Sequence, residues 1–244
     1  MAEVSGRNLL GGTHDGGLRA AEEREGPCGR RNRRSPDLGR TDRLTRALPQ
    51  TFWLIAPFAA WMALMTALPA TAGGYAVRTA VVALLLAAAC WRRRQAGGAP
   101  CRVSCAPLAW GLAVGLAVFV VWILPEQFDW PWYRRFCIVG EGGTQAVAEA
   151  SAALVAIRLF GSAFVISAAE ELFFRRWLIG FAGFWPTVAL FAVEHDRWLV
   201  GAVAGLAYGA LFLRRGLVSS IVAHATTNLL LGLWVLRTGQ WHFW

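Results

Sequence analysis

Long apolar runs constrain this chain more than any other feature. Hydrophobic residues make up 56% of its 244 residues, and they gather into blocks of about 18 residues or more, the length that an α-helix needs to cross a bilayer. Inside hydrocarbon every backbone N–H and C=O group must be paired within the protein, and a helix achieves this by itself. The sequence therefore predicts an all-α fold, a polytopic transmembrane helical bundle.

About seven membrane helices are expected, one of them short. They are predicted at about 52–72, 75–91, 108–124, 147–179, 186–195, 199–213 and 217–236. The fourth would be roughly 50 Å long as one unbroken helix, so a tilt or a break is expected in it. The fifth would rise only about 15 Å, which should leave His195 near the middle of the membrane. Gly205 and Gly209, four residues apart in the sixth, predict a close approach of two helices.

Residues 1–49 differ in composition from the rest of the chain. They are polar, rich in Gly and Arg, and lack apolar periodicity, so they cannot bury enough area to offset the entropy of ordering. We predict a disordered basic tail over 1–49 and a membrane bundle over 50–244.

The placement of arginines predicts the orientation. The formal net charge is +9, and every basic residue is an arginine. The tail and the loop Arg92–Arg94 flank the first two predicted helices on one side, which the positive-inside rule places in the cytoplasm. Arg134 and Arg135, in the loop 125–145, oppose this orientation. No basic stripe with interleaved aromatics is present, so the expected partner is the lipid bilayer and not a nucleic acid.

The first of three polar islands in the apolar helices holds two adjacent glutamates. Glu171 and Arg175 are four residues apart on one helix face, with the acid first, which is the better order for an ion pair. Glu170 has phenylalanines at the third and fourth positions after it. We therefore expect Glu170 to be an unpaired, desolvated carboxylate, suited to act as a general base near neutral pH.

The other two islands bring imidazoles. His195 follows Glu194 at the end of the short fifth helix, and His224 and Asn228 share one face of the last helix. Taken singly, such a histidine or asparagine can serve only as a hydrogen bond between helices. Glu194 and Asp196 can be loop charges that face water, and Phe191 is expected to pack.

The coincidence of these groups favours a functional site. A base, two imidazoles and an amide come from three apolar helices, so they are expected to face inward together. The predicted set is Glu170, His195, His224 and Asn228.

In this order, the three islands resemble the signatures of a known family. The motifs are Glu-Glu-x-x-x-Arg (Glu170, Glu171, Arg175), Phe-x-x-x-His (Phe191, His195) and His-x-x-x-Asn (His224, Asn228). They look like those of the CPBP intramembrane proteases, the CAAX-processing and bacteriocin self-immunity (Abi) proteins. The resemblance covers about residues 147–235, the expected catalytic core.

Other features are similar to the branch of this family that is associated with exosortase (PEP-CTERM) sorting. These are Trp53 with Ala56, Pro57 and Phe58, Glu194-His195 followed by Trp198, and the closing stretch Thr238-Gly239-Gln240-Trp241-His242-Phe243-Trp244.

The resemblance implies an endopeptidase within the bundle and gives each residue a role. Glu170 would activate water, and His195 would help to hold it. His224 and Asn228 would stabilise the oxyanion of the tetrahedral intermediate, which is usually worth about 3–4 kcal/mol per donor. Glu171 would hold the base in place together with Arg175.

A zinc mechanism remains open beside this one. Glu170, His195 and His224 could supply a two-His, one-Glu zinc site with an open position for water, and the base would then be Glu171 or Glu194. No His-Glu-x-x-His motif is present, so we favour the metal-free, glutamate-dependent mechanism and expect no cofactor.

The expected function is cleavage of membrane-associated or lipid-modified protein substrates in a bacterial inner membrane, with exosortase components as partners. One alternative is a non-catalytic membrane partner or assembly factor that keeps the polar set for packing. Another is a small transporter or proton relay, and the uneven helices without repeat symmetry argue against it.

Overall fold

The computed structural model describes residues 40–69, 71–97, 105–138 and 152–243. Within these ranges the regular elements are helices, and a single backbone bridge pairs Ile138 with Arg197. The all-α prediction is confirmed. Outside the described residues lie most of the predicted tail, the end of the predicted loop 125–145, the start of the predicted fourth helix (147–151) and Trp244.

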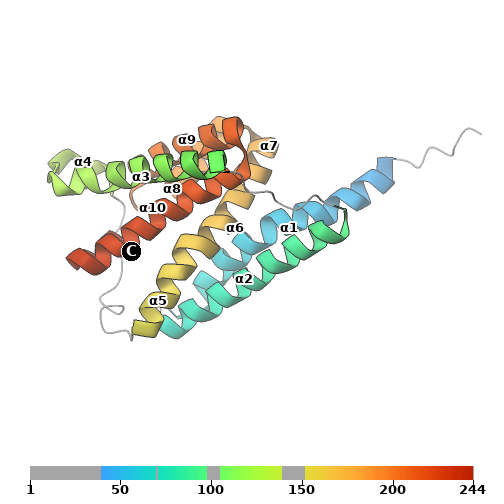
Figure 1. The fold of residues 1–244 in the computed structure, drawn as a ribbon, viewed down its shortest axis with the longest axis horizontal. Coiled ribbons are helices and arrows are strands. Elements are labelled where there is room, and N and C mark those ends of the chain that lie inside the picture. Colours follow the sequence, from blue (N-terminus) through green and yellow to red (C-terminus); the bar gives the residue numbers. More distant parts are fainter. Residues whose placement is uncertain (1–39, 70, 98–104, 139–151, 244) are drawn as a thin grey trace, which may run out of the picture. The chain divides into compact units, whose positions relative to one another are not determined.

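The helices follow one another as Figure 1 shows. They are α1 (Arg40–Ala67), α2 (Ala72–Gln95), α3 (Cys105–Gln127), α4 (Pro131–Cys137), α5 (Ala152–Phe160), α6 (Ser167–Glu171), α7 (Ile179–Ala182), α8 (Phe184–Val193), α9 (Trp198–Arg215) and α10 (Leu217–Thr238). Two π-helical stretches, η2 (Gly161–Ile166) and η3 (Leu172–Leu178), lie between α5, α6 and α7, and the 3-10 turn η4 (Trp241–Phe243) follows α10.

Five helical segments are long and apolar enough to cross a membrane. They are Gln50–Ala67, Gly73–Gln95, Cys105–Gln127, Ala152–Ala182 and Leu217–Thr238, and α8 is a shorter apolar helix. Each of the seven predicted helices has a counterpart in the described part of the chain. The protein is an integral, multi-pass membrane protein.

Three local features differ from the prediction. Helix α1 already begins at Arg40, before the predicted tail boundary at residue 49. The predicted loop 125–145 contains the short helix α4, whose first turn starts with Pro131, a residue whose fixed φ suits that position. The long fourth helix is continuous from Ala152 to Ala182, but η2 and η3 change its periodicity on either side of Glu170 and Glu171.

This long central helix lies between two groups of helices. Helices α1 and α2 pair on one side, and α3, α8, α9 and α10 gather on the other (Figure 1). Glycines allow the closest approaches. A Cβ atom built at Gly115 of α3 would lie 2.5 Å from the carbonyl oxygen of Ala223 in α10, and one at Gly209 would lie 2.7 Å from the Phe184 ring. The close approach predicted from Gly205 and Gly209 is therefore confirmed, between α8 and α9.

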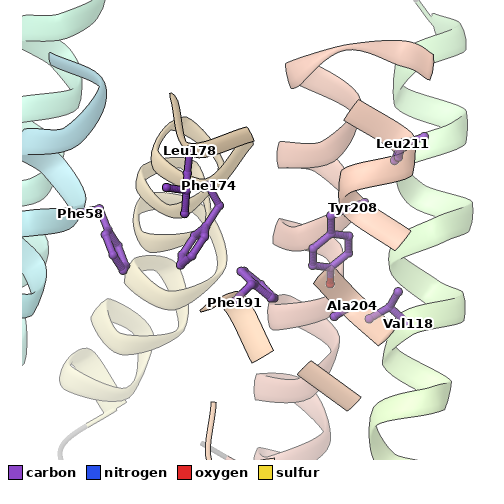
Figure 2. Packing of buried hydrophobic residues seen from close by; sticks show 9 residues of the cluster. Phe58, Val118, Phe174, Leu178, Phe191, Ala204, Tyr208 and Leu211 are labelled. Atoms are coloured by element: carbon purple, nitrogen blue, oxygen red, sulfur yellow. The ribbon is translucent and has the colours of Figure 1, made fainter. Parts of the chain in front are cut away.

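Aromatic side chains connect the two groups through the central helix. Phe58 of α1 contacts Phe174 of η3, and Phe174 points toward Phe191 of α8 (Figure 2), with ring centroids 5.1 Å apart. Phe191 is fully buried and also lies edge-on to Tyr208 of α9. Phe191 packs, as expected, and this aromatic row places α8 against the helix that carries the two glutamates.

Candidate active site

Glu171 is the centre of a buried charged network. Its Oε2 atom pairs with Nε of Arg175 at 3.2 Å, and neither side chain is exposed. Its Oε1 atom lies 3.1 Å from Nδ1 of His224. The guanidinium of Arg175 also lies 4.6 Å above the Phe191 ring. The predicted pair Glu171–Arg175 is thus present, and Glu171 additionally connects the central helix to α10.

Glu170 differs from its neighbour in having no arginine partner. It is 7% exposed, and its Oε2 atom makes no hydrogen bond to any described residue. The Nε2 atom of His224 lies 3.7 Å from that oxygen. This distance is too long for a hydrogen bond, so the carboxylate retains an oxygen that can accept a proton or bind water.

The two histidines each present one ring nitrogen to the site. In His224, Nδ1 donates to the carboxylate of Glu171, so Nε2 faces Glu170. In His195, Nδ1 lies 2.8 Å from the carbonyl oxygen of Phe191, and because a carbonyl only accepts, Nδ1 must carry the hydrogen. A neutral His195 therefore offers Nε2 as an acceptor.

Aromatic rings hold both imidazoles in place. Tyr208 stacks on His224 with centroids 4.9 Å apart, and its hydroxyl donates to Thr227 at 2.7 Å. Trp122 lies edge-on to His195 at 5.5 Å. Rings fixed in this way lose little further entropy when a substrate binds.

All four predicted catalytic residues line one cavity of about 300 Å³, a volume at the lower end of ligand sites. They come from α6, from the turn after α8 and from α10, so the expected inward-facing set is brought together. Its other walls include Trp61, Tyr75, Trp122, Arg158, Ser162, Glu194, Tyr208 and Phe243.

Asn228 reaches this cavity, but its amide nitrogen already has two partners. Nδ2 donates to the carbonyl of Ser162 at 3.2 Å and to the hydroxyl of Ser167 at 3.0 Å. These bonds join α10 to η2 and α6. An oxyanion role for Asn228 would require one of them to be exchanged for the substrate, whereas Nε2 of His224 needs no such exchange.

Glu194, which the sequence offered either as a loop charge or as the base of the zinc alternative, is part of the cavity. It lines the cavity, and its buried Oε2 atom has no hydrogen-bond partner in the part of the chain that the structure describes. The interpretation as a loop charge facing water was wrong. Arg197 is also buried and pairs with Glu126 of α3. The short rise of the fifth helix, from which we predicted that His195 lies near the middle of the membrane, applied equally to Glu194.

The residues suggested for zinc do not form a metal site as they stand. Within the described ranges, no group of three or more His, Cys, Asp or Glu side chains is arranged to hold a metal ion.

The fold and site together define a multi-pass membrane protein with a buried carboxylate and two imidazoles around an internal cavity. The family model described as "Type II CAAX prenyl endopeptidase Rce1-like" matches residues 152–230. This segment runs from α5 into α10 and contains all six predicted catalytic and supporting residues. Residues 152–230 are thus similar to the CPBP/CAAX family of membrane proteases. The comparisons with curated proteins and with solved structures gave no match.

Proposed function

We propose that this protein is an intramembrane endopeptidase that hydrolyses membrane-associated or lipid-modified proteins with a glutamate-activated water. The observation that carries the proposal is the Glu170 carboxylate, which is buried, keeps an oxygen without a hydrogen bond among the described residues, and faces a cavity shared with two imidazoles. Buried polar atoms are ordinarily paired, and an unpaired one points to a functional role.

The arrangement supports a general-base mechanism. A water in the cavity would donate one hydrogen bond to Glu170 and another to Nε2 of His195, whose other nitrogen is held by the carbonyl of Phe191. Glu170 takes a proton from this water. At the same time the water oxygen attacks the scissile carbonyl carbon and forms the new C–O bond. General-base assistance of this kind contributes about 10²–10⁴-fold in rate.

In this proposal His224 stabilises the negative oxygen that the attack creates. With both ring nitrogens protonated, Nδ1–H donates to Glu171 and Nε2–H is free to donate to the oxyanion. When the C–N bond breaks, the proton held by Glu170 passes to the leaving amine, which leaves a new amine and a new carboxylic acid. No step in this sequence requires a metal, and we propose a metal-free enzyme.

Glu171 acts on the reaction through His224. Its carboxylate fixes which nitrogen of His224 faces the cavity, and Arg175 holds that carboxylate. This is the supporting role expected for groups that orient a catalytic imidazole.

The orientation and the cellular setting are also proposals. The three arginines in the last turn of α2 support a cytoplasmic location for that end of the α1–α2 pair, following the positive-inside rule. Sorted proteins or components of an exosortase system would be the substrates or partners, on the strength of the sequence features in α1 and after α10.

The experiment is a cleavage assay with purified protein in lipid nanodiscs. A library of membrane-spanning and lipid-modified peptides is incubated with wild type, with and without a chelator, and products are identified by mass spectrometry. Cleavage that persists in chelator is the expected result. Cleavage abolished by chelator and restored by Zn²⁺ would support the zinc mechanism instead. An absence of cleavage across the library would favour the non-catalytic partner or assembly factor.

A further inference from the structure

The chain reverses after α10 and returns to the candidate active site. Gly239 ends the helix with φ 70°, a left-handed conformation that glycine adopts without strain. The side-chain oxygen of Gln240 then accepts hydrogen bonds from Gln127 at the end of α3 and from Trp234 of α10, both 3.0 Å. We call residues 239–243 the C-terminal turn.

A buried ion pair and a neighbouring histidine fasten this turn to the bundle. Glu126 of α3 pairs with Arg197 at the start of α9, and both side chains are 7% exposed. The other oxygen of Glu126 lies 2.9 Å from Nε2 of His242 in the turn. Arg197 in turn lies 4.9 Å above the Phe243 ring. Contacts between α3, the start of α9 and the C-terminal turn therefore fix the position of Phe243.

Phe243 is part of the cavity wall. Its side chain is 8% exposed and lines the cavity together with Trp122, Glu194 and His195. Trp122 contacts the His195 ring and lies one helical turn before Glu126 on α3. Arg197, which lies over the Phe243 ring, is two residues after His195, and we therefore infer that Phe243 lies at the end of the cavity that holds the His195 imidazole. It lies beyond residue 230, where the family match ends.

An aromatic wall beside the water-binding imidazole limits the space for the substrate. In the proposed mechanism the scissile bond must lie next to the water held by His195, so the substrate side chain nearest to that bond meets this wall. A hydrophobic pocket discriminates by size, and a single methylene group changes selectivity by about 10-fold or more.

We propose that Phe243 is a specificity-determining residue, whose ring sets the size of the substrate side chain accepted beside the scissile bond. This inference rests on the proposed function. It assigns the substrate class as peptides with a small side chain at that position, and it makes the C-terminal turn part of the substrate site.

The test varies one substrate residue and one wall residue together. A cleaved host peptide is prepared with Ala, Leu, Phe or Trp on each side of the scissile bond. For each enzyme the ratio of kcat/KM for the Trp peptide to that for the Ala peptide is measured. Phe243→Ala should raise this ratio by about tenfold or more, and Phe243→Trp should lower it. Phe128→Ala, at a phenylalanine that is 65% exposed, is the matched control and should leave the ratio unchanged.

A binding arm separates failure of this inference from failure of the proposed function. The same peptides, or, where no library peptide is cleaved, a library peptide that binds and carries the same four side chains at each position in turn, are labelled with a fluorophore. They are titrated against Glu170→Gln protein with and without Phe243→Ala, and anisotropy gives each Kd. A selective gain in affinity for the Trp peptide supports the inference even when no peptide is cleaved. An identical size preference in Phe243→Ala, Phe243→Trp and wild type, in either arm, overturns it.

Discussion

Replacing Glu171 by glutamine should destabilise the protein strongly, whereas the same change at Glu170 should not. Glu171 neutralises Arg175, and neither side chain is exposed. Glutamine at this position leaves a buried guanidinium without its counter-charge, and breaking a buried pair in this way costs about 3–5 kcal/mol. The ratio of folded to unfolded protein should fall by about 10²–10⁴-fold.

Glu170 makes no comparable interaction. Its free oxygen has no hydrogen bond to lose within the described ranges, so Glu170→Gln should change the free energy of unfolding by less than about 1 kcal/mol. Both variants replace a glutamate by a glutamine at adjacent positions, so each is the control for the other.

The assay is equilibrium unfolding in mixed micelles, followed by tryptophan fluorescence. A double variant, Glu171→Gln with Arg175→Gln, adds a thermodynamic cycle, because it removes both charges. Residues in one ion pair couple by about 0.5–3 kcal/mol, so the double variant should be more stable than the sum of the two single changes predicts. Equal destabilisation by Glu170→Gln and Glu171→Gln, or additive effects in the cycle, would refute the reasoning.

Two further predictions concern packing and pH. Gly115→Ala should lower the free energy of unfolding by about 1–3 kcal/mol, because the added methyl group overlaps the backbone of α10. Gly180→Ala is the control and should not lower it, because the space around Gly180 is open. Thermal melts compare the two variants. Burial holds the pKa of His242 below its usual value despite the Glu126 carboxylate. The opened C-terminal turn then binds more protons than the closed one, so acidification through about pH 6.5 should favour opening. Hydrogen exchange of residues 239–243, corrected for intrinsic rates, should show less protection at pH 5 than at pH 7.5, and His242→Gln should remove the difference; stronger protection in acid would contradict this.

The helices could be predicted because the bilayer requires long apolar runs. The Glu171–Arg175 pair could be predicted because residues four apart in a helix are about one turn apart and share a face. His224 and Asn228 could be assigned to one face for the same reason. These predictions rest on contacts within one helix, whose geometry is regular.

What could not be predicted depends on contacts between helices and on irregular helix geometry. The π-helical stretches η2 and η3 rotate the side chains on both sides of α6, and no simple spacing rule shows that Asn228 would meet Ser162 and Ser167. The pair of Glu126 with Arg197 joins residues 71 positions apart. Phe243 reaches the cavity only because the chain reverses at Gly239.

Glu194 is a different case, because the sequence held the signal. It precedes His195 at the end of a helix too short to reach the far surface, so the same argument predicts membrane depth for both side chains. Its position in the cavity beside Glu170 makes it the residue to compare with Glu170 in any activity assay.

The most direct test of the central claim is the turnover number of Glu170→Gln on a peptide that wild type cleaves. Asp129→Asn is the matched control, since it makes the same charge change at an exposed carboxylate. A general base at Glu170 predicts that kcat falls by about 10²–10⁴-fold, with peptide affinity and stability retained, and that Asp129→Asn matches wild type. Turnover by Glu170→Gln at the wild-type rate would contradict the account.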